Sequence, residues 1–392
     1  MKVHKLLVFI ALNCLFLLSC SKREESGFKP VNPKATPETQ QLLSFLYSIQ
    51  GKYTLTGQHH FVSDLKRYDQ VAYTMTGKYP AVWGSDFSFM AQGDSVHKYQ
   101  HCGPMNLTVP FDSCAFNDLS ITDLRQGMTD EAKRKYAEGR IITLMWHCCF
   151  PTECDECDGA DIWRLTDHLP SREEWDELVT EGTPLNTLWK QQMDGVAFYL
   201  KQLQEANIPV LWRPFHEMNG VWFWWCNKPG ENGFKKLWIA MYDYFTGHHE
   251  LNNLLWVWNA NAPRDKPGDE AGPYADFFPG IDYVDVLAAD VYNRDWKQSH
   301  HDDLLTLGRG KLISLGEVGE APTPEIYTAQ PSWSWFMVWG YCLYDFSKMR
   351  SGDGNWQNEN PAVKVIYDDP RSITLDMIDF SGNTYKLKKQ KS

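Results

Sequence analysis

The sequence is short of positive charge. Among its 392 residues, 38 are Lys or Arg and 50 are Asp or Glu, so the formal net charge is −12. Proteins that bind nucleic acids or anionic membrane surfaces do so through basic patches, so this balance argues against both kinds of partner. We expect the short basic segment at 386–389 to be a solvated end of the chain. The acidic balance is compatible with an uncharged ligand.

The sequence also lacks an apolar run long enough to cross a membrane as a helix. Its one extended run, at residues 6–18, is broken only by Asn13 and is shorter than the roughly 20 residues that a membrane-spanning helix needs. Lys2 and Lys5 precede the run, and this order of charged and apolar residues is typical of a signal peptide. We therefore predict a signal peptide over residues 1–19.

The end of this segment, Leu17-Leu18-Ser19-Cys20, resembles a bacterial lipobox. The resemblance implies cleavage before Cys20 and lipidation of its thiol. We expect a linker over residues 20–38 and a single domain over residues 39–392. Acidic residues just after the cysteine resemble those of Bacteroidetes lipoproteins. This implies an exported lipoprotein of the outer membrane, cell surface or periplasmic face, attached to the membrane through its lipid alone.

Eight of the ten cysteines remain outside the targeting segment: Cys102, Cys114, Cys148, Cys149, Cys154, Cys157, Cys226 and Cys342. An exported protein meets an oxidising environment, so some of them are expected to pair. Cys102 with Cys114 would close one loop, and the four cysteines between residues 148 and 157 would close another, with the connectivity left open. The same four follow His147 at a spacing that also fits zinc, but the export context favours disulfides, and we expect no metal or other cofactor.

The rest of the chain has no internal repeat and alternates short apolar runs with helical patterns. Helices are predicted at 39–50, 188–207, 233–245 and 302–307. The apolar runs predict eight strands: 53–57, 81–86, 141–146, 210–216, 254–259, 284–290, 311–316 and 336–339. Alternating strands and helices predict a parallel sheet, and eight such units predict a closed (β/α)8 barrel, which needs roughly 250 residues.

Aromatic residues are abundant, with 17 Trp, 18 Tyr and 20 Phe. Part of this content must belong to the core. The excess of Trp also indicates exposed stacking platforms, because an indole offers a flat apolar face at little entropic cost.

Two glutamates follow apolar runs at corresponding places. Glu217 lies in Trp212-Arg213-Pro214-Phe215-His216-Glu217-Met218-Asn219-Gly220, and Glu317 lies between Gly316 and Gly319 after the run 312–315. Both would stand at the carboxyl ends of barrel strands, the fourth and the seventh, where barrel enzymes carry their active sites. Glycoside hydrolysis with retention needs two carboxyls about 5–5.5 Å apart, one protonated and one ionised. Tryptophans around one acid would raise its pKa toward the working pH.

The stretch 212–220, followed by Trp222-Phe223-Trp224-Trp225, resembles the acid/base motif of glycoside hydrolase family 26. The resemblance runs from about residue 40 to 376 and includes Gly57-Gln58-His59 and Trp146-His147. Most members are retaining endo-β-1,4-mannanases that need no cofactor. The resemblance therefore implies a monomeric enzyme that acts on β-mannan-type polysaccharides or oligosaccharides, with Glu217 as acid/base and Glu317 as nucleophile.

The resemblance also implies roles for neighbouring residues. His216 would help to orient the nucleophile, Tyr292 would donate its hydroxyl to Glu317, and Arg213 would be a charge partner of the acids. Contacts with sugar are implied for His147, Trp163, Trp222 and Trp339. Trp224 and Trp225 cannot both face a cleft in an extended segment, because side chains alternate.

Several alternatives stay open. The family scaffold also supports β-1,3-1,4-glucanases, β-1,3-xylanases and exo-acting mannobiohydrolases. The segment Cys148-Cys149-Phe150-Pro151 departs from the residues that members more often carry, which leaves chain-end and mid-chain cleavage both open. A surface glycan-binding lipoprotein without activity is a more distant alternative, since both glutamates are present.

Overall fold

The computed structural model of the protein describes residues 29–62, 65–87, 120–153, 157, 162, 169–344 and 360–389. Its centre is a barrel of eight parallel strands: β1 (Thr54–His59), β2 (Val82–Asp86), β3 (Ile141–Trp146), β4 (Val210–Pro214), β5 (Leu254–Asn261), β6 (Val286–Val291), β7 (Leu312–Val318) and β8 (Trp333–Val338). β1 pairs with both β8 and β2, so the sheet is closed. The predicted (β/α)8 barrel is confirmed.

Every barrel strand is buried along its whole length, which explains why the strands are visible as apolar runs. All eight predicted strands are present. The largest difference is at β8, which begins at Trp333 rather than at residue 336.

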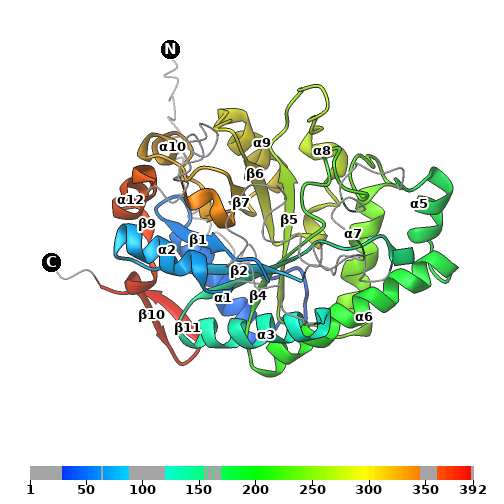
Figure 1. Ribbon diagram of the computed structural model, residues 1–392, viewed down its shortest axis with the longest axis horizontal. Coiled ribbons are helices and arrows are strands. Elements are labelled where there is room, and N and C mark those ends of the chain that lie inside the picture. Colours follow the sequence, from blue (N-terminus) through cyan, green and yellow to red (C-terminus); the bar gives the residue numbers. More distant parts are fainter. Residues whose placement is uncertain are drawn as a thin grey trace, which may run out of the picture.

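Helices surround the barrel (Figure 1). They are α1 (Pro37–Ile49), α2 (Arg67–Thr76), α3 (Ile121–Ala137), α5 (Arg172–Leu178), α6 (Pro184–Glu205), α7 (Phe234–Asp243), α8 (Tyr274–Phe277), α9 (Gln298–Gly308), α10 (Pro324–Ala329) and α12 (Pro361–Asp368). α7 continues into the π-helix η5 (Tyr244–His248), and short 3-10 helices are η4 (Pro151–Glu153), η6 (Ile281–Tyr283), η7 (Gly340–Leu343) and η8 (Leu375–Met377). Within the described ranges, no helix has the length and apolar character to cross a membrane.

The amino-terminal end of the barrel is closed by α1 and by the C-terminal segment. A short strand, β9 (Ser372–Ile373), pairs with β1, and the hairpin of β10 (Ile378–Ser381) and β11 (Thr384–Leu387) packs against α1, with the rings of Phe45 and Tyr385 stacked 5.7 Å apart. The described part of the predicted linker is also docked, because the Val31 N–H donates to the Asp285 carboxylate at 2.7 Å. The packed region thus begins before residue 39.

The tryptophans are mostly core residues, and the expectation of many exposed stacking platforms is wrong for the described part of the chain. Eleven of them are less than 2% exposed: Trp83, Trp146, Trp189, Trp212, Trp224, Trp225, Trp238, Trp256, Trp258, Trp333 and Trp335. Most of them lie in barrel strands or in the helices around the barrel, whereas Trp224 and Trp225 lie in the loop after β4. The half-buried Trp222 at the barrel mouth is an exception.

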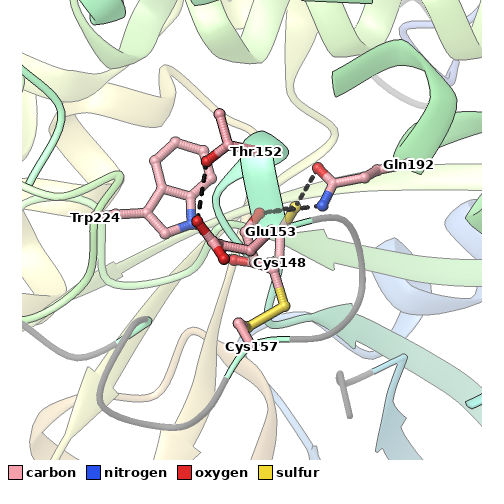
Figure 2. Close-up of a disulfide and its surroundings, with 7 residues drawn as sticks. Cys148, Thr152, Glu153, Cys157, Gln192 and Trp224 are labelled. Carbon is pink, nitrogen blue, oxygen red and sulfur yellow. Dashed lines mark hydrogen bonds between the residues drawn. A yellow bond between two sulfur atoms is a disulfide. The ribbon is translucent and has the colours of Figure 1, made fainter. Parts of the chain in front are cut away.

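A disulfide joins two residues of the loop that follows β3 (Figure 2). Cys149 pairs with Cys157, so these two sulfurs are not available as zinc ligands. The loop is further fixed because the Trp224 indole N–H donates to the Cys148 carbonyl at 2.7 Å and Gln192 donates to the Cys149 carbonyl at 3.3 Å. Among the described cysteines, Cys148, Cys226 and Cys342 are buried thiols. The expected pair Cys102–Cys114 lies outside the described residues, as does Cys154.

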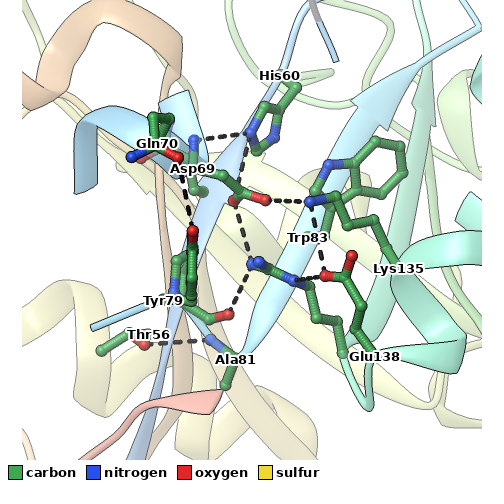
Figure 3. Close-up of polar contacts among 12 residues, drawn as sticks. Thr56, His60, Asp69, Gln70, Tyr79, Ala81, Trp83, Lys135 and Glu138 are labelled. Carbon is green, nitrogen blue, oxygen red and sulfur yellow. Dashed lines mark hydrogen bonds and ion pairs between the residues drawn. The ribbon is translucent and has the colours of Figure 1, made fainter. Parts of the chain in front are cut away.

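A buried ionic cluster connects α2 and α3 with the start of β3 (Figure 3). The Asp69 carboxylate lies 2.8 Å from Lys135 Nζ, 3.2 Å from Arg140 Nη1 and 3.3 Å from His60 Nε2. Burial alone would raise the pKa of Asp69, but the contacts with His60, Arg140 and Lys135 outweigh it and lower the pKa below its usual range. The buried Asp69 carboxylate therefore stabilises the packing of α2 and α3 against the barrel on this side.

We predict that Asp69→Asn destabilises the protein by about 3–5 kcal/mol, because it leaves buried cations without their partner. Urea unfolding monitored by tryptophan fluorescence measures the change. The exposed Asp368, which pairs with Lys78 on the surface, provides the control: Asp368→Asn should stay within about 1 kcal/mol of the wild type.

The contribution of Asp69 to the free energy of unfolding depends on pH in a defined direction. Because folding lowers the pKa of Asp69, its contribution is present above the unfolded value near about 3.9 and is lost as the pH falls below it. Equal stability of wild type and Asp69→Asn at neutral pH would contradict this account of the cluster.

Candidate active site

Glu217 is held at the carboxyl end of β4 by an unusual backbone. Phe215 and Glu217 have φ angles of 48° and 56°, in the left-handed region that residues with side chains rarely adopt. The Glu217 N–H donates to the Asn259 carbonyl at 2.8 Å, while its own carbonyl accepts from Gly220 N–H at 2.9 Å and from the Cys226 thiol at 3.1 Å. These bonds fix a strained turn that points the carboxyl into the barrel mouth.

The Glu217 carboxyl is buried and accepts only from neutral donors. The Trp222 indole N–H donates to Oε2 at 2.6 Å, and the Asn261 amide donates to Oε1. Burial, followed by the charge of Glu317, raises the pKa of Glu217 to about 7, although the two hydrogen bonds oppose the rise. A carboxyl with this pKa can give and take a proton near neutral pH.

Glu317 reaches the mouth through an irregularity in β7. Ala289 pairs with Leu315 and Asp290 with Glu317, so Gly316 is an extra residue in the register. A Cβ atom on Gly316 would lie 1.6 Å from the Asn259 side-chain oxygen. Glycine is therefore required here for the close approach of Asn259, and the bulge aims Glu317 toward the barrel axis.

The Glu317 carboxylate has stronger donors than Glu217. Arg213 Nη1 donates to Oε1 at 2.7 Å, and the Tyr292 hydroxyl donates to Oε2 at 2.7 Å. His216 Nε2 lies 3.7 Å from Oε1, which is longer than a hydrogen bond. Burial, followed by the charges of His147 and Arg213, lowers the pKa of His216 well below its usual value, so this imidazole is neutral. An arginine and a phenol thus favour the ionised form of Glu317.

The two glutamates share the mouth with a third acid, Asp290. Glu217, Asp290 and Glu317 each offer a carboxyl oxygen within 4.8 Å of the others. Asp290 is fully buried, and neither of its oxygens has a hydrogen-bond partner among the described residues. Burial, reinforced by Glu317, raises the pKa of Asp290 well above its usual value. Such a group of oxygens can also bind a divalent cation, but Arg213 already balances the charge of Glu317.

His147 and Trp339 form the wall of the mouth beside Glu317. His147 Nδ1 lies 2.7 Å from the Asp86 carboxylate, and its ring contacts that of His216 edge-on at 4.6 Å. The Trp339 ring stacks on that of His59 at 4.1 Å with planes 13° apart. One face of Trp339 is therefore covered by an imidazole, which fixes the position of the indole.

Trp222 forms the wall beside Glu217. It packs closely over Gly220, where an added Cβ would lie 2.4 Å from the indole, and the Arg264 guanidinium lies 5.0 Å from its ring centroid. With its N–H on Glu217, the indole is held by three contacts. Trp224 and Trp225 are both buried, and their indole N–H groups donate to the carbonyls of Cys148 and His216.

The structure brings together eight of the residues singled out in the sequence: Glu217, Glu317, Arg213, His216, Tyr292, His147, Trp222 and Trp339. Trp163 and Cys20 lie outside the described residues. Sequence reasoning missed Asp290, Asn259, Asn261, Arg264 and His59. Asp290 and Asn261 are polar residues at the carboxyl ends of buried strands. That position could have indicated from the sequence that they belong to the site.

Comparisons with known proteins agree with this geometry. The sequence model of the family described as Glycosyl hydrolase family 26 matches residues 31–98 and 109–377. A mannan endo-1,4-beta-mannosidase of Bacillus subtilis strain 168 is 36% identical over 79% of this chain and 80% of its own length. The corresponding Thermothelomyces thermophilus protein is 31% identical over 88% of this chain, which spans only 62% of that relative. The structure of GH26A from Muricauda sp. MAR_2010_75 is 42% identical, covers 89% of this chain and 100% of its own, and has a TM-score of 0.74.

We predict that Glu317→Gln lowers the pKa of Glu217 from about 7, because it removes the negative charge next to it while burial persists. Carbon-13 NMR titration of labelled glutamate carboxyls measures the change without any substrate. Glu325→Gln, which removes an exposed acid from α10, is the matched control and should leave the titration unchanged. An unaltered Glu217 pKa in Glu317→Gln would show that the two carboxyls do not interact.

Proposed function

Because the chain belongs to glycosyl hydrolase family 26, we propose that it is a retaining endo-β-1,4-mannanase that hydrolyses mannan, glucomannan or galactomannan. The observation that carries the proposal is the pair of buried carboxyls with oxygens within 4.8 Å of each other and with opposite surroundings. This closeness suits the short carboxyl separation of retaining enzymes, because no room is left for a water molecule between the second carboxylate, Glu317, and the sugar.

In the first step, a Glu317 oxygen attacks the anomeric carbon and the glycosidic bond breaks. Glu217 gives its proton to the leaving oxygen, so the departing sugar carries a neutral hydroxyl and Glu217 becomes ionised. The glycone is left as an ester of Glu317. The Arg213 and Tyr292 donors keep Glu317 ionised before the attack.

In the second step, the ionised Glu217 takes a proton from water, the water oxygen attacks the anomeric carbon, and the Glu317 ester bond breaks. Two inversions give net retention. The net reaction adds one water molecule to one glycosidic bond. Glu217 must be an acid in one step and a base in the other, and a pKa of about 7 suits both.

The other residues of the mouth bind and orient the sugar under this proposal. His147 and Trp339 contact the sugar that becomes attached to Glu317. Trp222 lies beside Glu217, where the leaving sugar departs. His216 lies against both Glu317 and His147 and holds their relative position by packing. Trp163 is proposed to bind sugar on the basis of family resemblance alone.

Relatives named mannan endo-1,4-beta-mannosidase support the choice of β-mannan over other β-glycans. The disulfide between Cys149 and Cys157 lies in the loop that follows β3 and His147, and the product profile described below distinguishes mid-chain from chain-end cleavage. We also propose that the protein is a lipoprotein exported through its lipobox and that it acts as a monomer. Extracellular polysaccharide is the substrate such an anchored enzyme would meet.

We predict that Glu317→Ala lowers turnover of mannan by roughly 10³-fold or more, since no nucleophile remains. Binding of mannan should persist, as measured by affinity electrophoresis in mannan gels. Glu325→Ala on α10 is the control and should retain wild-type turnover. A wild type that binds mannan without cleaving it would instead identify a glycan-binding protein.

The substrate and the mode of cleavage are tested by product profiles on purified glycans. Faster cleavage of mannan than of mixed-linkage β-glucan or β-1,3-xylan is expected. A ladder of mannooligosaccharides identifies endo action, whereas accumulation of mannobiose alone would identify an exo-acting enzyme. Cleavage of mixed-linkage glucan with no cleavage of mannan would overturn the mannanase proposal.

A further inference from the structure

The loop that follows β5 folds back on itself beside Glu217. Arg264 and Ala271 form an isolated antiparallel bridge, with backbone hydrogen bonds of 3.0 and 2.9 Å. The loop is docked on the turn that carries Glu217, because Asn219 donates its amide to the carbonyls of Asn261 and Gly272 at 2.8 Å each. Its backbone is therefore fixed relative to the acid.

Arg264 is the centre of this loop. Its Nε donates to the Asp269 carbonyl at 2.8 Å, and Nη2 pairs with the Asp269 carboxylate. Its other arm, Nη1, donates to the side-chain oxygen of Asn261. The guanidinium also lies over the Trp222 ring. Arg264 thus contacts both of the side chains that donate to Glu217.

The contact with Asn261 decides which way its amide faces. A free amide can turn by 180° and present either its oxygen or its NH2 group to Glu217. A guanidinium has only donors, so the Asn261 oxygen must face Arg264, and the NH2 group must face Glu217. With Trp222 on the second oxygen, Glu217 then has a fixed N–H donor on each side.

We propose that Arg264, clamped by Asp269, is a positioning residue that holds Asn261 and Trp222 as fixed donors to Glu217 and so supports its ionised form in the second step of hydrolysis. The role in hydrolysis rests on the proposed function, but the contacts of Arg264 with Asn261 and Trp222, and their effect on the titration of Glu217, do not depend on it. Among the described residues, the charged and titratable groups around Glu217 are Glu317 from β7, Asp290 from β6, Tyr292 just after β6, Arg213 from β4, Cys226 from its own loop and Arg264 itself. Arg264 is the cation among them that is not bound to Glu317.

Titration of Glu217 by carbon-13 NMR tests the proposal without substrate. In Arg264→Met, loss of the charge and release of the Asn261 amide should make proton binding by Glu217 about tenfold tighter, which raises its pKa above about 7. Asp269→Asn keeps the arginine but loosens its clamp, so a smaller change in the same direction is expected. Lys266, in the same loop, also pairs with Asp269. Lys266→Met removes this positive charge and should leave the titration of Glu217 unchanged.

Kinetics give a second and separate readout. In Arg264→Met, a smaller fraction of Glu217 is ionised at neutral pH and able to take a proton from water. Hydrolysis of the glycosyl ester is then slower, so kcat on mannooligosaccharides should fall more than kcat/KM. An unchanged Glu217 titration in Arg264→Met, or an equal change in Lys266→Met, overturns the proposal even in an active enzyme. A protein that cleaves no glycan but shows the titration change would overturn the hydrolase function and leave the positioning role intact.

A second, independent feature lies on the outer wall between α6 and η5. Asp194, His248 and His249 each offer one ligand atom within 4.8 Å of the others. His249 Nε2 and the Tyr244 hydroxyl both lie 2.8 Å from the same Asp194 oxygen, and the His248 ring stacks on that of Tyr244 at 4.7 Å with planes 6° apart. These contacts orient all three side chains before any ion binds, and the π-helical turn is what places His248 beside Tyr244.

The structure assigns to this cluster a divalent transition-metal site of two imidazoles and one carboxylate, with Zn²⁺ as the best-fitting ion. Imidazole and carboxylate ligands suit Zn²⁺, and the exposed position leaves coordination places for water. The nearest cation, Lys190, lies over the Tyr244 ring and is paired with Glu181. A bound ion would connect α6 to the end of α7 and stabilise that wall.

Calorimetric titration of the protein with Zn²⁺ tests this site. Asp194→Asn and His248→Ala should each weaken binding by roughly tenfold or more and abolish the rise in Tm that Zn²⁺ causes in the wild type. Asp243→Asn removes the same charge from the same helical segment outside the cluster and should bind like wild type. Absence of binding by the wild type, or equal binding by His248→Ala, would overturn the assignment.

Discussion

Glu217 and Glu317 share one buried mouth with Asp290, and the rest of the site depends on keeping the charges of the two glutamates unequal. Two carboxyls that are buried a few ångströms apart do not readily ionise together, so one of them holds its proton more tightly. Here the difference comes from the donors. Glu317 accepts hydrogen bonds from an arginine and a phenol, whereas Glu217 accepts hydrogen bonds from an indole and an amide. The acid that accepts from the cation is suited to act as the nucleophile, and the acid without a cation, whose pKa is raised to about 7, can hold the proton.

The fold supplies this arrangement through strand ends and local departures from regular structure. Parallel strands bring β4 and β7 to opposite sides of one mouth, but regular strands would not aim both acids inward. The extra residue at Gly316 turns Glu317, and the left-handed backbone at Glu217 turns its partner. Both irregularities are held by Asn259, whose carbonyl accepts from Glu217 and whose side chain fills the space over Gly316. One asparagine thus braces both halves of the site.

The sequence was most informative where one physical rule governed a whole segment. Strands buried on both faces are continuous apolar runs, so all eight could be located, and acids at their ends could be singled out. The start of β8 was missed because Trp333-Ser334-Trp335 alternates with a polar residue, although Ser334 is fully buried. The disulfide partner could not be chosen among neighbouring cysteines, because loop geometry rather than spacing decides it.

Contacts that depend on register could not be predicted from sequence. Asp290, Asn261 and Arg264 are single polar residues, and nothing in their neighbours says that they meet Glu217. Tryptophan was misleading for a related reason: its indole serves equally as core and as platform, and only packing distinguishes the two. Eleven fully buried indoles belong to the close-packed interior, whereas Trp222 is held by Arg264 and Trp339 by His59. A close-packed interior resists relaxation, so the aromatic content acts on chemistry indirectly by limiting how far the buried acids can separate.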